Sequence, residues 1–196
     1  MVLFTDESKF NVSEADGRRR VYRSKGERFN DNCVEKVNRW GGGSVHVWGG
    51  ITRNAKTDLV VLNRNVTADS YINDVLNPVA LPFIRHHFPR GGVTFQHDNA
   101  PAHRARLTTA HIQNNNVNVM DWPALSPDMA PIEHVWDELG RRVRARVPPP
   151  RDVAQLRRAL VQEWNNMPQQ RVTNIVSSMR RRCQACITSR GSYTRY

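Results

Sequence analysis

The stretch VTFQHDNAPAHRARLTTAHIQN, residues 93–114, contains a strand, a turn and a helix in close succession. Residues 93–96 form a short apolar run that is typical of a buried strand, and Asp98 follows two residues later. Pro101 suits the first turn of a helix, for which we expect Asn99 to be the cap. The stretch therefore predicts an α/β unit with an acidic residue at the end of its strand.

Strand patterns precede this unit. Residues 2–5 form a short strand that ends at Asp6, and the remaining strands are expected at residues 9–12, 20–23, 44–52 and 58–62. The segment 24–38 is polar and charged without a clear period. We therefore interpret residues 11–38 as an excursion inserted into the domain rather than as part of its core.

Helical patterns become frequent after residue 66. Thr67 is the expected N-cap of a helix whose apolar side chains recur at helical spacing, and Pro78 and Pro82 inside it predict a kink or a split. Further elements are expected as a strand at 117–120 and helices from Pro131 to Pro148, at 152–165 and at 169–181, the last two within a C-terminal helical part, 148–196. This order predicts one α/β domain over residues 1–196, with a mixed sheet flanked by helices.

Length and charge narrow the classes of function. The 196 residues suffice for one domain, and no apolar run approaches the roughly 20 residues of a membrane span, so we expect no membrane partner. The formal net charge is +11, and 25 of the 29 basic residues are Arg. Arg can contact phosphate bidentately, which favours a nucleic-acid partner. A generic cationic surface has the same composition, and charge alone does not separate the two.

Three acidic residues lie where a metal site could be assembled. Asp6 and Asp98 follow strands, and Glu133 lies in the first turn of a helix that begins with a proline. Oxygen ligands of this kind suit Mg²⁺, and clustered carboxylates repel each other until a cation is bound. Acidic residues at strand and helix ends are more often caps that face water. Position alone therefore does not decide their role.

The strings around these acids resemble signature blocks of Tc/mariner superfamily transposases. They are FTDESKF around Asp6, QHDNAPAHRA around Asp98 and SPDMAPIEHVWDELGRRVR around Glu133, and 34 residues separate the second acid from the third, as in the Tc-like branch. WGGGSVHVWGGI and the ending RRRCQACITSRGSYTRY are also similar to that branch. The resemblance covers essentially the whole chain, and several strings in the same order are more specific than one motif.

The resemblance implies an RNase H-like, retroviral-integrase-like catalytic domain of the DDE type. Asp6, Asp98 and Glu133 match the metal-binding acids of the family, which act with two Mg²⁺ or Mn²⁺ ions. The implied reaction is hydrolysis of DNA strands at transposon ends, followed by joining of the 3′-hydroxyl to target DNA. The implied partner is double-stranded DNA rather than a small-molecule substrate, in the nucleus. The position of the excursion at residues 11–38 matches a segment that contacts the partner subunit of a homodimer in some relatives.

One departure from the family pattern concerns DNA recognition. Family members carry N-terminal helix-turn-helix modules, whereas Met1 stands five residues before Asp6, so we expect this recognition module to be absent. This favours, as an alternative, a catalytically silent nucleic-acid-binding remnant of a transposase. A general RNase H-like nuclease for RNA–DNA hybrids is a third hypothesis, against which the family strings argue.

Several other residues have two interpretations. His97, His103 and His134 flank the acids and could orient water or contact DNA, or be ordinary polar neighbours. The basic run that follows Glu133 consists of Arg141, Arg142, Arg144 and Arg146, and it also suits a solvated helix end. We expect it to contact DNA through Arg141, Arg142 and Arg144. Asp137 could be an auxiliary ligand, but the motif places the metal acid at Glu133. The spacing Cys183-Gln-Ala-Cys186 provides two of the four ligands that a zinc site needs, which favours a structural role.

Overall fold

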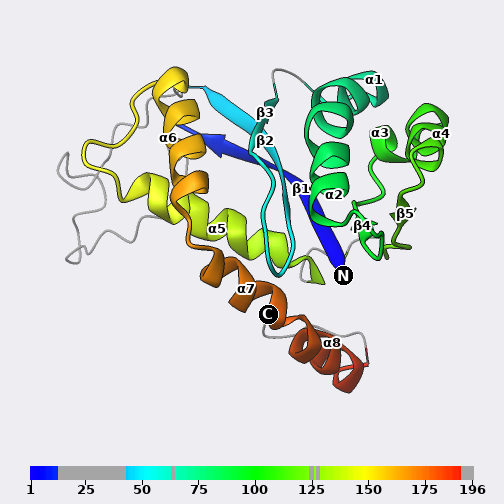
Figure 1. Ribbon diagram of the computed structural model, residues 1–196. Coiled ribbons are helices and arrows are strands. Elements are labelled where there is room, and N and C mark those ends of the chain that lie inside the picture. Colours follow the sequence, from blue (N-terminus) through cyan, green and yellow to red (C-terminus); the bar gives the residue numbers. More distant parts are fainter. Residues whose placement is uncertain (13–42, 63–64, 124–125, 127–128, 191–196) are drawn as a thin grey trace, which may run out of the picture.

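The computed structural model describes residues 1–12, 43–62, 65–123, 126 and 129–190. Within these residues, five strands form one sheet in the order β3-β2-β1-β4-β5 (Figure 1). They are β1 (Val2–Asn11), β2 (Ser44–Ile51), β3 (Val60–Leu62), β4 (Thr94–Gln96) and β5 (Asn118–Val119). The central strand β1 pairs antiparallel with β2 and parallel with β4. The predicted mixed sheet is therefore confirmed.

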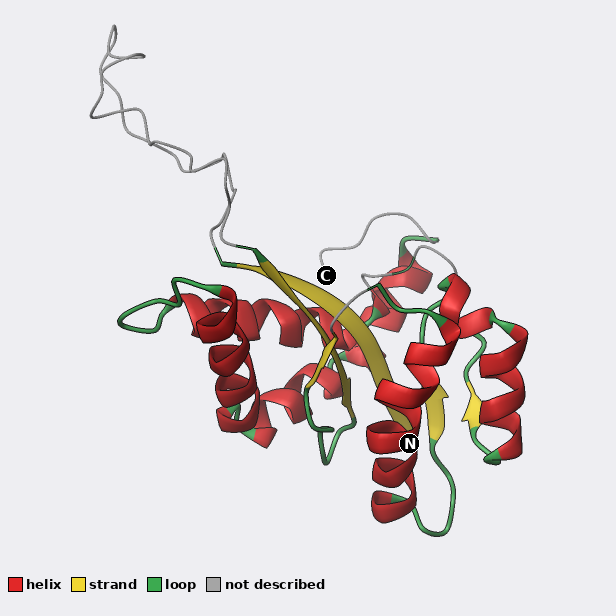
Figure 2. Ribbon diagram, turned by 90° about the horizontal axis from the view of Figure 1, so that it is seen from above, coloured by secondary structure: helices red, strands yellow, loops and turns green. Residues whose placement is uncertain are grey.

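Helices cover both faces of the sheet, as the view in Figure 2 shows. Because side chains alternate along a strand, neighbouring residues of β1 belong to different cores. Leu3 packs in a cluster with η2 (Tyr71–Ala80), α2 (Leu81–His87) and α4 (Arg106–Asn114). Phe4 packs in the other cluster, with α5 (Pro131–Arg144), α6 (Val153–Asn166) and α7 (Gln169–Ser177). No helix within the described ranges is long and apolar enough to cross a bilayer.

The first strand is longer than the sequence pattern predicted. The expectation of one strand at 2–5 and another at 9–12 was wrong, because β1 continues through Asp6 to Asn11. Its ladder with β2 runs without interruption from the pair Phe4–Ile51 to the pair Asn11–Ser44. Backbone pairing thus keeps polar residues extended in the middle of the strand. The expected strand at 20–23 and most of the excursion at 11–38 lie outside the described residues.

The helix after Thr67 confirms two expectations. Thr67 caps the short helix α1 (Ala68–Ser70), and its hydroxyl accepts from the Ser70 amide. Hydrogen bonds in the following η2 span five residues, as in the bond from the Leu81 amide to the Leu76 carbonyl, before the α-helical α2 begins. This π-helical turn contains Pro78, which has no amide hydrogen to donate. The predicted split therefore takes the form of a change in helical period.

The C-terminal part contains one more break than expected. The single stretch predicted at 169–181 is divided into α7 and α8 (Met179–Thr188) at Ser178, whose hydroxyl donates to the carbonyl of Ile175. The same hydroxyl accepts from Nε of the buried Arg182, so the junction is held by side-chain hydrogen bonds. Cys183 and Cys186 both lie on α8 and are free thiols.

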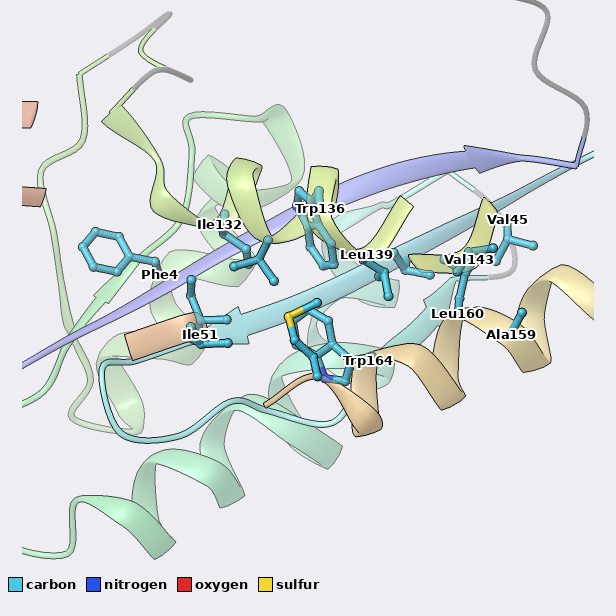
Figure 3. Close-up of a cluster of buried hydrophobic side chains, with 14 of the residues drawn as sticks. Phe4, Val45, Ile51, Ile132, Trp136, Leu139, Val143, Ala159, Leu160 and Trp164 are labelled. Carbon is cyan, nitrogen blue, oxygen red and sulfur yellow. The ribbon is translucent and has the colours of Figure 1, made fainter. Parts of the chain in front are cut away.

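Two tryptophans form the centre of the core beneath the middle of β1. Trp136 of α5 and Trp164 of α6 stack with ring centroids 5.3 Å apart (Figure 3). The indole N–H of Trp164 donates to the carbonyl of Thr57, 2.8 Å away. A Cβ atom at Gly49 of β2 would lie 2.9 Å from the Trp136 ring and 3.0 Å from the Trp164 ring. Only a glycine lets both rings approach this strand.

We expect Gly49→Ala to destabilise the fold by about 1–3 kcal/mol, because the stacked rings have no free space into which to move. The free energy of unfolding measured in urea checks this. Gly140→Ala is the matched control, since its nearest non-bonded contact is the flexible end of Arg144 at 3.3 Å and Ala favours the helix interior. An equal loss of stability in both variants would contradict the packing argument.

Candidate active site

Asp6 projects from the middle of β1 toward α5. It pairs with Gly49 of β2, and its Oδ2 accepts a hydrogen bond of 3.0 Å from the indole N–H of Trp136. Burial, followed by the negative charges of Glu133 and Glu7, raises the pKa of Asp6 from 3.8 to about 7, although the Trp136 bond opposes the shift. A carboxyl group is therefore held among like charges in partly dehydrated surroundings, which is unfavourable without a cation.

Glu133 lies in the first turn of α5, where Pro131 begins the helix and Ile132 anchors it in the core. Its pKa is raised by partial burial, although the residue remains exposed. Its charge acts on Asp6. The fold thus brings together the first and third acids, which are far apart in the sequence.

Asp98 lies two residues beyond the end of β4. The last pair of the β1–β4 ladder is Phe4–Gln96, so Asp6 and Asp98 each stand two residues further along adjacent parallel strands. Oδ1 of Asp98 accepts hydrogen bonds from the Ala100 amide at 2.9 Å and from Nδ1 of His103 at 2.7 Å. The second acid therefore lies just beyond the end of the strand that pairs with the N-terminal part of β1.

The expected cap at Asn99 was wrong. The cap position of α3 (Pro101–Arg104) is Ala100, which makes no side-chain capping bond. The Asn99 amide group instead donates to the carbonyl of Trp122. Asn99 thus ties the loop after β4 to the loop after β5. The predicted helix at 101–114 is divided into α3 and α4.

His103 connects Asp98 with a fourth acid. Its ring is 3% exposed, and its Nε2 lies 3.2 Å from Oε1 of Glu7 while its Nδ1 bonds Asp98. Burial lowers the pKa of His103, but hydrogen bonds and charges of Glu7 and Asp98 outweigh it and raise the pKa overall. Both ring nitrogens face carboxylates, which only accept, so both act as donors.

The pKa of the neighbouring His97 is shifted in the opposite direction from that of His103. Burial and then the charge of His103 lower its pKa to about 4, against the opposing charge of Asp98. Its Nδ1 lies 3.4 Å from the hydroxyl of the fully buried Tyr71. His97 is therefore neutral at neutral pH. His134 on α5 is set apart from this cluster, and burial followed by the charge of Arg182 lowers its pKa.

Comparison with known proteins decides the family. A model of the DDE superfamily of endonucleases matches residues 1–157. The chain belongs to this superfamily. The Tcb1 transposase of Caenorhabditis briggsae is 37% identical over 198 residues, covering 99% of this chain and 70% of the relative. The Tc1 transposase of Caenorhabditis elegans is 35% identical over 196 residues, with the same coverage. The resemblance to Tc/mariner transposases is thus confirmed.

Solved structures identify the fold of this DDE domain. A Mos1 mariner paired-end complex with Mg matches with a TM-score of 0.78 at 20% identity, covering 98% of this chain and 56% of that one. The catalytic domain of Mos1 mariner transposase matches with a TM-score of 0.72 at 18% identity, covering 98% and 83%. The predicted RNase H-like fold is confirmed. The chain spans little more than half of the Mos1 chain in the paired-end complex.

The acids of the DDE domain fit a hard divalent cation by their chemistry. Asp6 and Glu133 interact through their charges, and Asp98, two residues beyond the end of β4, carries a further oxygen donor. Across the described residues, no three His, Cys, Asp or Glu side chains are arranged so that they could together hold a metal ion. Asp6, Asp98 and Glu133 as joint metal ligands therefore stay a prediction.

The arginines that follow Glu133 lie in different environments. Arg142 donates from Nε to Glu163 of α6 at 3.2 Å, and Arg146 bonds the same carboxylate at 2.8 Å. Arg141 is 60% exposed and pairs with Asp137 and Glu138 on its own helix. Arg142 thus ties α5 to α6, while Arg141 faces solvent. Contact of Arg141, Arg142 and Arg144 with DNA stays a prediction.

Two contributors to the site were missed at the sequence level. Helical periodicity places Trp136 on the apolar face of its helix, but it does not indicate that the indole N–H reaches Asp6. Glu7 was not predicted to contribute to the site. Strand alternation could have indicated that Glu7 faces the side of the sheet opposite Asp6 once the long strand β1 was recognised.

We expect Asp6→Asn to remove a pH dependence of stability in the metal-free protein. The pKa of Asp6 is raised in the folded state, so its ionisation costs stability as the pH rises from about 4 to 7 and the loss is complete above 7. The variant should therefore match the wild type at pH 4 and be more stable at pH 8, by roughly 2–4 kcal/mol. Urea unfolding at both pH values checks this.

Addition of Mn²⁺ at pH 8 provides the complementary measurement. We expect it to raise the melting temperature of the wild type, because a bound cation relieves the carboxylate repulsion, and to leave Asp6→Asn nearly unchanged. Identical pH profiles and identical Mn²⁺ responses of the two proteins would contradict the charge cluster.

Proposed function

We propose that this domain hydrolyses DNA strands at transposon ends and joins the freed 3′-hydroxyl to target DNA with divalent metal ions. The supporting observation is the placement of Asp6 and Glu133 within reach of each other's charge, with Asp98 just beyond the end of the neighbouring strand β4, in a chain of the DDE superfamily. Phosphodiester chemistry needs such oxygen donors more than it needs a nucleophilic side chain. In this proposal the nucleophiles are water and then a DNA 3′-hydroxyl.

The residues of the chain have distinct parts in this chemistry. Asp6, Asp98 and Glu133 would hold two Mg²⁺ or Mn²⁺ ions, which when bound activate the attacking oxygen and stabilise the leaving oxygen. Asp6 must be ionised to bind a cation, and the Trp136 N–H stabilises that form while fixing one carboxylate oxygen. The pairing of Asp6 with Gly49 in the continuous β1–β2 ladder limits the movement of the Asp6 backbone.

The partner proposed for this site is double-stranded DNA. A net charge of +11 supports electrostatic attraction to phosphates. Similar structures include Mos1 transposase in a paired-end complex with the left transposon end and Mos1 complexes with Mn and Mg. By this likeness we also propose a homodimer that acts on paired ends, and chromosomal DNA in the nucleus as its place of action.

We expect Asp98→Asn to abolish cleavage of a labelled transposon-end duplex in Mn²⁺, with a loss of at least about 100-fold, because an amide is a poorer metal ligand than a carboxylate. Products resolved on a denaturing gel check this. Asp74→Asn, which changes an exposed carboxylate on η2, should cleave like the wild type.

The same assay separates the proposal from the remnant alternative. Metal-dependent nicking that is equal in wild type and Asp98→Asn would remove Asp98 from the mechanism. Salt-sensitive DNA binding without any metal-dependent product would instead support a silent remnant. Preference for an RNA–DNA hybrid over duplex DNA would favour the general nuclease.

We expect Arg141→Gln and Arg142→Gln to have different effects. Loss of the exposed Arg141 should weaken DNA binding and reduce the slope of log K against log salt by about 1. Loss of Arg142 should lower the free energy of unfolding by about 1 kcal/mol, because Glu163 then keeps Arg146 but loses its bond to Arg142. Fluorescence anisotropy at several salt concentrations and urea unfolding measure the two effects. The expectation fails if both variants change only DNA affinity.

A further inference from the structure

One oxygen of the Asp98 carboxylate is held although the side chain is 53% exposed. Oδ1 accepts from the Ala100 amide and from His103, whereas Oδ2 has no hydrogen-bond partner among the described residues. An exposed aspartate ordinarily samples several rotamers. Two bonds to one oxygen fix the plane of this carboxylate and leave the other oxygen available to a ligand.

The donor of the shorter bond is held in place by its surroundings. His103 is 3% exposed, and its ring centroid lies 4.3 Å from that of Tyr71 and 4.9 Å from that of His97, at an interplanar angle of 16° in the second case. Tyr71 itself is fully buried. The imidazole therefore cannot change rotamer without disturbing two neighbouring rings, and it presents Nδ1 to Asp98 in one orientation.

The other ring nitrogen reaches β1. Nε2 of His103 bonds Oε1 of Glu7, which is adjacent to Asp6 but directed to the opposite face of the strand. The regular β1–β4 ladder ends at the pair Phe4–Gln96. Beyond that point, the bridge Glu7–His103–Asp98 connects β1 with the segment that follows β4. It restrains Asp98 relative to β1 where the β1–β4 ladder no longer does.

The hydrogen bond from His103 to Asp98 is poorly explained by a role in fold stability alone. A hydrogen bond to a half-exposed carboxylate competes with water and contributes little to the free energy of folding. Its larger effect is on the orientation of the acceptor. Hydrogen bonds that orient ligating carboxylates typically change metal affinity or activity by 10- to 100-fold.

We propose that His103, anchored by Glu7, is a positioning residue for Asp98 and sets the affinity of the acidic site for a divalent cation. The inference rests on the proposed function, because it assigns Asp98 to cation binding. It adds two residues from the opposite face of the sheet to the determinants of that binding.

Two near-isosteric variants of His103 test the proposal. The amide nitrogen of Asn can take the position of Nδ1, and that of Gln the position of Nε2, so His103→Asn keeps the bond to Asp98 and His103→Gln keeps only the bond to Glu7. Mn²⁺ binding to the full chain is measured from the loss of the free-ion electron paramagnetic resonance signal. We expect affinity within about 3-fold of wild type for His103→Asn and weaker by about 10- to 100-fold for His103→Gln.

Activity and stability readouts separate positioning from folding. The DNA-cleavage rate of His103→Gln should recover toward that of wild type at saturating Mn²⁺, with an unchanged KM for DNA. The melting temperatures of the two metal-free variants should agree. In a second pair, Glu7→Gln keeps an acceptor for Nε2 and should bind Mn²⁺ more tightly than Glu7→Ala, which also provides the test should the His103 variants fail to fold.

The outcomes are distinct. Equal Mn²⁺ affinities for His103→Asn and His103→Gln, or for Glu7→Gln and Glu7→Ala, overturn the positioning role while wild type and Asp98→Asn still differ. If wild type binds Mn²⁺ no more tightly than Asp98→Asn, Asp98 is not a ligand. The metal site of the proposed function and this inference then fall together.

Discussion

The carboxyl group of Asp6 is held on the central strand, under partial burial, beside the charge of Glu133. This arrangement is unfavourable by itself, and the remaining structure is what enforces it. Pairing with β2 along its whole length, and with β4 up to Phe4, keeps β1 in place, and the indole N–H of Trp136 donates to the carboxylate of Asp6. The packing of the rest of the domain thus holds carboxylates close together, and a bound cation would neutralise their charge.

Helix α5 joins the core to this site. Its apolar face packs against α6 and the sheet through Val135, Trp136 and Leu139, while its first turn presents Glu133. At the far end of the same helix, Arg142 is bound to Glu163 of α6. Because both ends are fixed to other elements, Glu133 approaches Asp6 as part of a rigid body rather than through a mobile loop.

The acids could be found from the sequence because their local strings and spacing are specific. The helical period also identified the buried face of α5 and the cap at Thr67. What could not be predicted depends on tertiary contacts. The polar residues Asp6 and Glu7 indicated the end of a strand, but pairing with β2 carries β1 through them. The side chain of Asn99 bonds the carbonyl of Trp122 in a distant loop instead of capping the helix. The partners of Trp136, His103 and Arg142 come from distant segments, which no local pattern reveals.

The opposite orientations of Asp6 and Glu7 on β1 make the length of this strand a determinant of chemistry. Inserting or deleting one residue between Val2 and Asp6 would rotate the following side chains to the other face of the sheet. A deletion would bring Glu7 to the place of Asp6 beside the indole of Trp136, whereas an insertion would bring Asp6 to the place of Glu7 beside His103. Changes of two residues would preserve the faces but shift the acid by a full repeat, out of line with Asp98. The number of residues in this segment is therefore more tightly constrained than their identity.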